Sequence, residues 1–328
     1  MRVAVIGTGP AGCAAAISLR QLGREVVLLG DGIDGVGEQL HPAARPLLKS
    51  LGLTDLPGQL DCVGINTAWD SSALFEQNFL SHPFGNGWLL DRVGFGETLR
   101  KTAQFAGAKL RVPSRILGIS RDASGDSRWN LKLSDGDEKC DWLVDATGRR
   151  GAVGRLLGVK RRRIDRQVAI VGWLDANGSD DVDLTLTVEK VENGWWYSCR
   201  LPGERRVVGY VTHARPDAKN WEARLRATQH LSRLVQNYRL ESPLSVRAAD
   251  STILEKCYGR GWIAIGDAAL SYDPLASRGL VSALDQGIRV APLIGAAESQ
   301  LAAWQANLKA TFDAYVLERS KMIGKTPE

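Results

Sequence analysis

The chain has 328 residues, of which 44 % are hydrophobic and 24 % are charged, and its formal net charge is +5. This length and balance fit one large globular domain or two closely packed ones, and they exclude an intrinsically disordered chain. No apolar run reaches the roughly 18–20 residues of a membrane span, and the N-terminus enters a predicted strand at once. We therefore expect neither a membrane segment nor a signal peptide.

Five cysteines and four histidines are scattered along the chain. Without a CxxC pair, a disulfide framework is not expected, and the cysteines favour a reducing, cytoplasmic location. No two histidines have the spacing of ligands on a helix, so we expect no bound metal. The basic run VKRRRIDR at 159–166 is either a solvated loop or a patch for an anionic partner or a cofactor phosphate. Nucleic acid is not an expected partner, because no aromatic residues interleave with this run.

The N-terminal segments RVAVIGTGPAG, CAAAISLRQLG and EVVLL predict a strand, a glycine turn, a helix and a second strand. The turn has GxGxxG spacing, in which Gly7 permits a tight turn, Gly9 lets a pyrophosphate approach and Gly12 lets the helix pack on the strand. Pro10 and Ala11 belong to the same turn. Phosphates would meet the free N–H groups at the start of the helix. The pattern predicts a dinucleotide site.

The second strand ends at Gly30, where this type of site usually has an acid that holds the adenosine ribose. Asp31 follows Gly12 by 19 residues, close to the expected interval of about 20. Side chains alternate along a strand, so an acid displaced by one residue points the wrong way unless the flexible Gly30 re-aims it. Asp31 is thus a candidate ribose ligand, and we expect comparatively loose retention of the dinucleotide.

The rest of the chain predicts an α/β fold in two parts. Helices are expected over 38–53, 93–108, 220–237, 277–296 and 298–320. Strands are expected near 109–112, 115–121, 128–133 and 139–148, then over 166–174, 183–191, 194–201 and 205–213. Period-two alternation in the second group of strands favours a mainly antiparallel sheet. We expect a Rossmann-like domain from 1–165 and 255–328, and an inserted β-sheet substrate domain over 166–254 that takes up part of 60–92.

GRGWIAIGDAALSYDPLASRGL, at 259–280, places Asp267 after a hydrophobic strand and a glycine. Small residues permit close approach of a cofactor, and a carboxylate at a strand end can bind sugar hydroxyls. This segment resembles the second flavin signature of the FAD-dependent monooxygenase and tryptophan-halogenase-like superfamily. LLDRVGFGETL at 89–99, VDATGR at 144–149 and GVGEQLHPAARPLLKSLGL at 35–53 resemble further motifs of the same superfamily.

The resemblance implies a glutathione-reductase-like fold, of the aromatic-hydroxylase type, with resident FAD. Arg92 would then lie near the pyrophosphate, Asp267 would hold the ribityl chain, and Pro274, Gly279 and Leu280 would approach the isoalloxazine. The other cofactor contacts that the resemblance implies are Glu38, Ile116, Gly148 and Gly266. No second GxGxxG unit follows in the later chain, so electrons would come from transiently docked NAD(P)H or from a separate reductase.

In this superfamily, reduced FAD reacts with O2 to give a flavin hydroperoxide, and the protein positions an electron-rich substrate. The WxWxIP element of the halogenase branch does not occur in this sequence, which disfavours halogenation. ENGWWYSCRLPGERRVVGYVTHA at 192–214, together with YDPLASRGL at 272–280, resembles flavoprotein maturases that help to build cysteine tryptophylquinone. This resemblance implies a monooxygenase that hydroxylates a tryptophan of a quinoprotein precursor.

Trp173, Trp195, Trp196 and Tyr197 are candidates for the wall of a substrate chamber, with core packing as the alternative for each. Adjacent strand residues face opposite sides, so Trp195 and Trp196 cannot both face the flavin. Candidate proton-transfer groups are His41, His213 and Asp273. His213 stands where the maturases commonly have an acid. Two other functions stay open, a hydroxylase of a small free aromatic metabolite and a flavin-stabilised chaperone for the precursor.

Overall fold

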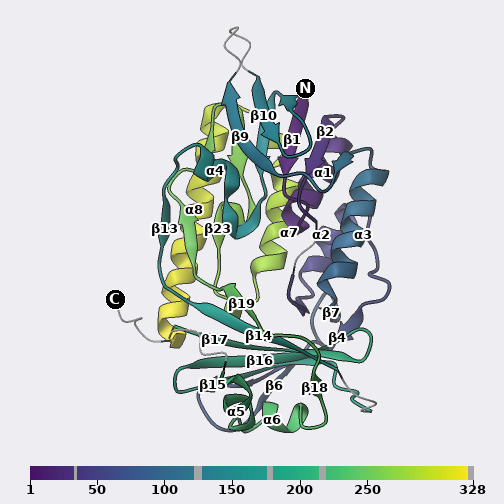
Figure 1. Cartoon of the computed structure of the whole chain (residues 1–328), viewed down its shortest axis with the longest axis vertical. Helices are drawn as coiled ribbons and strands as arrows, with labels where there is room; N and C mark the ends of the chain where they lie inside the picture. Colours follow the sequence, from purple (N-terminus) through teal and green to yellow (C-terminus); the bar gives the residue numbers. More distant parts are fainter. Residues whose placement is uncertain (33–34, 122–127, 176–179, 214–218, 324–328) are drawn as a thin grey trace.

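The computed structural model describes residues 1–32, 35–121, 128–175, 180–213 and 219–323. Its upper part in Figure 1 is a layered α/β unit that contains the N-terminus, and its lower part is a broad sheet that lies across the end of this unit. The predicted α/β fold with a Rossmann-like nucleotide-binding part is confirmed.

The upper part is built on a six-stranded, mainly parallel sheet in the order β21-β22-β12-β1-β2-β8. Its strands are β1 (Arg2–Ile6), β2 (Glu25–Leu29), β8 (Lys109–Arg111), β12 (Trp142–Asp145), β21 (Tyr258–Gly259) and β22 (Trp262–Ala264). The apolar residues of β1 and β2 are buried because helices or further strands cover both faces of the sheet. Helix α1 (Pro10–Gln21) starts at a proline, continues through an alanine run and packs on α7 (Gly279–Arg289).

Smaller elements surround this sheet. The remaining helices of the upper part are α2 (Ala44–Ser50), α3 (Arg92–Phe105), α4 (Ala152–Leu156) and α8 (Glu298–Ile323). Three small sheets contain β3 (Glu38–Leu40), β4 (Leu60–Cys62) and β7 (Gly87–Leu90); β9 (Ile116–Arg121), β10 (Trp129–Leu133) and β11 (Glu138–Cys140); and β13 (Arg161–Arg163), β20 (Thr252–Leu254) and β23 (Leu270–Ser271). None of the described helices is long and apolar enough to cross a membrane.

The lower part is an eight-stranded sheet in the order β18-β14-β17-β16-β15-β5-β6, with β19 also paired to β14. Its strands are β5 (Gly64–Ala68), β6 (Phe75–Asn78), β14 (Val168–Asp175), β15 (Thr185–Val191), β16 (Gly194–Leu201), β17 (Arg205–Thr212), β18 (Arg239–Leu240) and β19 (Ser245–Ala248). All described neighbours pair antiparallel except β5 and β15. We propose to keep the domain division 1–165 with 255–328 against 166–254, with the β5–β6 hairpin added to the substrate domain.

Three helix predictions differ from the structure: one helix starts later than predicted, one is divided in two, and one ends earlier. Residues 38–40 form β3, because their backbone pairs with β7, and Pro42 disfavours helical geometry in the residue before it. The predicted helix 220–237 is two short helices, α5 (Trp221–Arg226) and α6 (Leu231–Leu234). The Glu189 carboxylate accepts N–H bonds from residues 229–231 and thereby starts α6. Helix α7 ends at Arg289, and a short 3₁₀ turn that contains Pro292 follows.

Candidate flavin site

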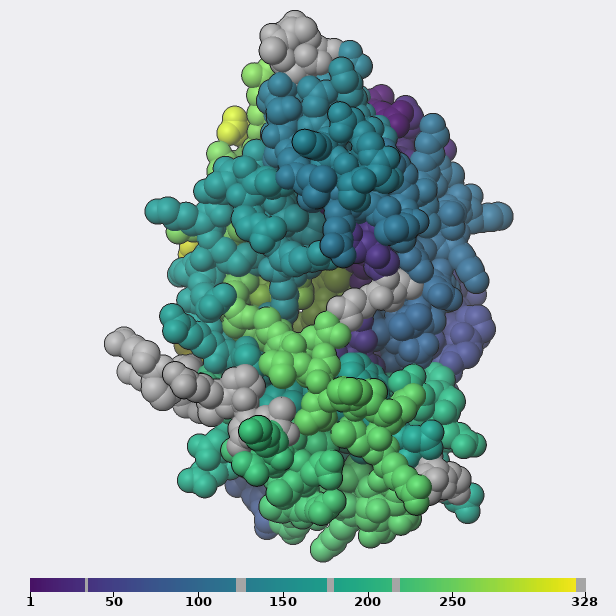
Figure 2. Space-filling model, viewed as in Figure 1, coloured from purple at the N-terminus to yellow at the C-terminus, as the bar shows by residue number. Residues whose placement is uncertain are grey.

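The predicted cofactor motifs meet at one edge of the parallel sheet. The Gly7–Gly9 turn follows β1, Gly30 follows β2, Gly148 lies shortly after β12, and Asp267 lies shortly after β22. The carboxyl ends of these parallel strands share one edge, which is where ligands bind in open α/β sheets. In Figure 1 the N-terminus lies far from the eight-stranded sheet, so this edge faces that sheet, and Figure 2 shows a recess between the two parts.

The glycine turn is tight on its inner side and open on its outer side. A Cβ at Gly12 would lie 1.8 Å from the carbonyl oxygen of Gly7, and one at Gly7 would lie 2.0 Å from that of Ala146. Gly9 is exposed, and no atom lies within 4 Å of its Cβ position. No side chain caps the start of α1. The first N–H groups of α1 therefore face open space, as binding of a pyrophosphate requires.

Arg92 and Glu38 form an ion pair in the same cleft. Asp91 accepts N–H bonds from the first turn of α3 and so fixes the start of the helix that carries Arg92. The Nε atom of Arg92 is buried and has no hydrogen-bond partner among the described residues. The Glu38 side chain is 41 % exposed. The surrounding protein nevertheless desolvates its carboxyl and raises its pKa, whereas the charge of Arg92 lowers this pKa. Both groups thus line a deep cleft, and Arg92 retains a donor that fits a phosphate oxygen.

Asp267 lies in the same cleft, 35 % exposed. Burial raises the pKa of its carboxyl, while Arg149, Arg92 and Arg161 act in the opposite direction. The Nε atom of Arg149 lies 3.6 Å from an Asp267 carboxylate oxygen. Arg161 of β13, from the basic run, donates to the carbonyl oxygen of Asp267 at 3.2 Å and to that of Ala268. The short turn that carries Asp267 is therefore held from behind, and its carboxylate is left for a sugar hydroxyl.

Asp267→Asn is expected to stabilise the cofactor-free protein at neutral pH and to weaken FAD binding. Burial raises the folded-state pKa of Asp267, so its favourable contribution is complete below the unfolded pKa of about 3.9 and is lost as pH rises through the folded value. Asparagine has no such charge to bury. Thermal melts between about pH 4 and pH 8 should show a flatter profile for the variant. A profile that follows the wild type would contradict this account.

Sequence reasoning missed Arg149, although the residue belongs to the VDATGR segment. Its guanidinium donates to the carbonyl oxygen of Tyr272 at 2.7 Å, to the Ser271 hydroxyl at 3.2 Å and to the backbone of Asp250. These contacts connect the turn after β12 to the end of β23 and to the residues just before β20. The motif match could have indicated Arg149, but its partners lie more than 100 residues away in the chain.

Gly30 and Asp31 follow β2 and contact other parts of the protein, while the ribose contact of Asp31 stays a prediction. A Cβ at Gly30 would lie 2.7 Å from Oγ1 and 2.8 Å from Cγ2 of Thr8, which is buried in the glycine turn. The Thr8 hydroxyl donates to the carbonyl oxygen of Gly32 at 3.1 Å. Asp31 pairs with Arg150 at 2.9 Å and with Arg115 at 3.1 Å. Thr8 thus fills the space of the missing side chain, and two arginines hold Asp31.

Gly30→Glu alone is expected to weaken FAD binding rather than to restore a ribose contact, because its Cβ would clash with Thr8. The double variant Thr8→Gly/Gly30→Glu removes this obstruction. We expect it to bind FAD about tenfold more tightly than Gly30→Glu does, a difference of about 1.4 kcal/mol. Titration calorimetry of the cofactor-free proteins with FAD measures both affinities. Equal affinities would rule out the steric explanation.

The other predicted cofactor contacts occupy varied positions. Gly148 has φ +63° with open space at its Cβ position, and Gly266 has φ +57° and backs onto Ala11. Pro274 is exposed in a 3₁₀ turn. Gly279 is exposed and starts α7, and Leu280 beside it is buried. Ile116 is half-buried at the start of β9 and packs on the main core. Their roles toward FAD stay predictions.

The three predicted proton-transfer residues do not form one site. The carboxylate of Asp273 is 1 % exposed, lies 3.0 Å from the Nε atom of Arg319, and accepts the N–H of Leu275 at 2.9 Å. Both of its oxygens are thus engaged by protein groups, which favours a structural role, and the catalytic role of Asp273 stays a prediction. His213 belongs to the same region, and its Nε2 atom lies 2.9 Å from the Gln167 amide. Burial and the charge of Arg319 lower the pKa of this imidazole.

His41 lies in a separate aromatic cluster. Its Nδ1 atom accepts the N–H of Ala43 at 3.2 Å, and its ring meets Phe79 and His82 edge-on at centroid distances of 5.4 Å and 5.2 Å. Burial and His82 lower the pKa of His41. This imidazole is therefore mainly neutral at neutral pH. His41 stays a candidate for proton transfer, three residues after Glu38 in the chain.

The predicted aromatic wall is divided between the two faces of the eight-stranded sheet. Trp173, Trp195 and Tyr197 share the inner face, in one apolar cluster with Val36 and Leu275. Burial and the Glu38 carboxylate raise the pKa of Tyr197, which places its phenol beside the cleft. Trp196 lies on the outer face, 1 % exposed, stacked on Tyr210 beneath α5. Its prediction as a chamber residue is wrong, because alternation along β16 turns it away.

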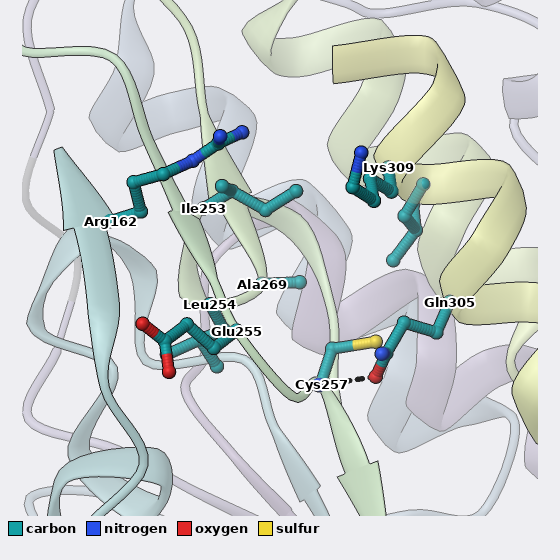
Figure 3. Close-up of a pocket in the computed structure, with 9 residues that line it drawn as sticks. Arg162, Ile253, Leu254, Glu255, Cys257, Ala269, Gln305 and Lys309 are labelled. Carbon is teal, nitrogen blue, oxygen red and sulfur yellow. Dashed lines mark hydrogen bonds between the residues drawn. The ribbon is translucent and has the colours of Figure 1, made fainter. Parts of the chain in front are cut away.

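A second concavity lies between β20 and α8 (Figure 3). It is lined by Arg162, Ile253, Leu254, Glu255, Cys257, Ala269, Gln305, Leu308 and Lys309. The backbone N–H of Cys257 donates to Gln305 at 3.1 Å, and burial raises the pKa of its thiol to about 12. Such a thiol is unreactive at neutral pH. This groove is separate from the nucleotide cleft and adds no chemistry to it.

Comparison with known proteins identifies the family. Residues 61–315 match the model of the tryptophan halogenase family. The chain belongs to this family. Its first 55 residues also match the model described as pyridine nucleotide-disulphide oxidoreductase. Proteins of these families are flavin-dependent enzymes, and this protein is an FAD-dependent oxidoreductase. The predicted resemblance is confirmed, and the glycine turn, Arg92 and Asp267 provide a cleft that fits FAD.

Individual relatives are similar over most of the chain. The putative FAD-dependent oxidoreductase LodB of Marinomonas mediterranea is 30 % identical, over 84 % of this chain and 79 % of that protein. The structure of the peptidyl tryptophan dihydroxylase QhpG, essential for tryptophylquinone cofactor biogenesis, is 26 % identical with a TM-score of 0.75, over 90 % of this chain and 66 % of that one. The flavin-dependent halogenase CmlS shares the fold, with a TM-score of 0.81 at 21 % identity over 96 % and 62 % of the two chains.

Proposed function

We propose that the protein is an FAD-dependent monooxygenase that hydroxylates a tryptophan side chain of a partner polypeptide, a quinoprotein precursor, during the biogenesis of cysteine tryptophylquinone. The observation that carries the proposal is the aromatic inner face of the eight-stranded sheet, where Trp173, Trp195 and Tyr197 share one cluster and Tyr197 lies beside Glu38 of the flavin cleft. An indole can stack on such a wall. The similarity to LodB and to the peptidyl tryptophan dihydroxylase QhpG supports this proposal.

The chain's own groups would bind and orient. The N-terminus of α1 and Arg92 would hold the pyrophosphate, and Asp267 would hold the ribityl chain. Bound and reduced FAD supplies the activation of O2. Because burial and Glu38 raise the pKa of Tyr197, its hydroxyl stays protonated at neutral pH and can only donate or accept hydrogen bonds there. The Trp195 indole N–H, buried without a hydrogen-bond partner in the described residues, could meet an acceptor on the substrate.

We further propose that NAD(P)H, docked transiently, or a separate reductase supplies the electrons, because after residue 35 the sequence has no second GxGxxG unit, and GDGIDG at 30–35 is followed by strand β3 instead of a helix. O2 would be the co-substrate. A cytoplasmic location stays a prediction from the cysteines, all five of which are free and buried. A basic loop that accepts an anionic partner is not part of this proposal, since Arg161 of that run binds the turn around Asp267.

Product formation with three substrates separates the competing functions. The FAD-loaded protein is given an electron donor and O2 with free tryptophan, with a short tryptophan peptide, or with a candidate precursor polypeptide. We expect oxygenated product from the polypeptide at a rate that free tryptophan does not approach. Equal rates with free tryptophan would favour a metabolite hydroxylase. Maturation of the precursor by a folded Asp267→Ala variant without flavin would favour a chaperone.

A further inference from the structure

We infer that strand β6 is a docking edge for an extended, positively charged segment of the partner polypeptide. This inference rests on the proposed function, because it identifies where the polypeptide substrate would be held. β6 lies at one end of the eight-stranded sheet and, within the described residues, pairs only with β5. Its four residues, Phe75–Asn78, are all exposed.

The backbone register shows which groups of β6 are free for pairing. The N–H of Phe79 donates to the carbonyl oxygen of Val63 at 2.7 Å. In an antiparallel pair, hydrogen-bonded positions alternate with non-bonded ones, so Gln77 also faces β5. The backbone groups of Glu76 and Asn78 therefore point away from the sheet. An exposed edge of this kind accepts a further strand by β-augmentation.

Apolar side chains flank this edge. Phe75 on β6 is 71 % exposed, and Leu80, two residues after the strand, is 90 % exposed. With a period of two, Phe75 shares a face with Phe79, whose ring packs in the same cluster as Trp195 of the inner face. Sheet edges are usually protected by lysine or proline, and β6 contains neither. The apolar edge is thus continuous with the wall of the proposed chamber.

The charge of this region indicates the chemistry of the partner segment. Residues 50–91 contain no lysine or arginine, although the whole chain has a net charge of +5. Of the acids in this stretch, Asp70 and Glu76 belong to the β5–β6 hairpin, whereas Asp55, Asp61 and Asp91 lie in other elements. Glu76 lies on β6 itself. An acidic edge favours a segment that carries lysine or arginine between its apolar residues.

The distance to the aromatic wall limits how the partner can reach it. Neighbouring strands lie about 4.8 Å apart, and β15, β5 and β6 follow β16 in the sheet. A strand added to β6 would lie about 19 Å from β16. Extended chain spans about 3.3 Å per residue, so about six residues would connect the docked strand to a tryptophan in the chamber. The docked strand would therefore anchor the partner, and the flanking segment would carry the tryptophan.

Calorimetric titration with synthetic peptides tests this inference. The probe has alternating valine and lysine, a glycine–serine spacer and one tryptophan, and the matched probe has glutamate in place of lysine. Glu76→Pro removes the charge and the outward N–H, whereas the control Glu76→Ala removes only the charge; proline is tolerated at such edge positions. We expect the cofactor-free wild type to bind the lysine probe at least about tenfold more tightly than the glutamate probe, and Glu76→Pro to bind it about tenfold more weakly than Glu76→Ala.

Equal affinities of Glu76→Pro and Glu76→Ala, or of the two probes, would overturn the inference. So would a concentration-dependent dimer that only Glu76→Pro abolishes, since the edge would then serve a second copy of the chain. If Glu76→Pro does not fold, Phe75→Ser/Leu80→Ser takes its place, because both side chains are largely exposed. Binding is measured without FAD or turnover, so intact docking with no oxygenation of any tryptophan would refute the proposed function alone.

Discussion

Replacing Gly9 by alanine is expected to abolish FAD binding while the cofactor-free protein stays folded. Gly9 has extended backbone geometry that alanine also adopts, and no protein atom lies within 4 Å of the new methyl group. That methyl group would stand at the open N-terminus of α1, where the pyrophosphate must approach. We expect affinity for FAD to fall at least about 100-fold, or about 2.7 kcal/mol.

Gly12→Ala is the matched control for this prediction. Its Cβ would lie 1.8 Å from the carbonyl oxygen of Gly7, so the helix and the strand could not keep their present packing. This variant should therefore melt at a lower temperature even without cofactor, whereas Gly9→Ala should melt like the wild type. Fluorescence titration with FAD and thermal melts measure both effects. A Gly9→Ala protein that retains flavin through purification would show that the phosphates bind elsewhere.

Trp195→Leu and Trp196→Leu are expected to differ in their effect on turnover, although the two residues are neighbours and both are buried. Trp196 packs between Tyr210 and Trp221 on the outer face, so its truncation should cost about 2 kcal/mol of stability, with little change in the turnover of the folded protein. Trp195 lies on the inner face, beside Tyr197. Loss of an aromatic contact there should lower kcat/KM for a tryptophan peptide by up to about tenfold.

Steady-state kinetics and denaturant unfolding of both proteins separate these effects. The measurement compares the stability loss with the loss of kcat/KM in each variant at a temperature where both are folded. A Trp196→Leu protein that loses kcat/KM as strongly as Trp195→Leu would contradict the assignment of the inner face as the chamber wall.

Local sequence patterns predicted the strands and the glycine turn well, because each depends on residues close in the chain. The alternation along β16 predicted that Trp195 and Trp196 face opposite sides, but only the packing of α5 decided which side Trp196 takes. The helix prediction over 38–53 was wrong at its start because β3 pairs with β7, about 50 residues further along. The local sequence pattern around residue 38 does not include β7, so it could not predict this pairing.

In the candidate site as well, contacts between residues far apart in the chain could not be predicted from the sequence. The motif around Asp267 predicted its position at the end of a strand, and the structure brings it into one cleft with Glu38 and Arg92. Asp273 belongs to the same motif, but its partner Arg319 comes 46 residues later on α8, so this ion pair could not be predicted from the motif. The sequence also did not predict that the Thr8 side chain occupies the space beside Gly30, because these two residues are 22 positions apart in the chain.

Peptide mass spectrometry after reaction under ¹⁸O2 tests the central claim most directly. The FAD-loaded protein, with an electron donor, is incubated with a candidate quinoprotein precursor and then with the same precursor after replacement of its target tryptophan by phenylalanine. We predict that one or two labelled oxygen atoms appear on that tryptophan and that the replaced precursor stays unmodified. A halogen on the tryptophan, oxygen derived from water, or an unmodified precursor in the presence of bound, reduced flavin would contradict the account.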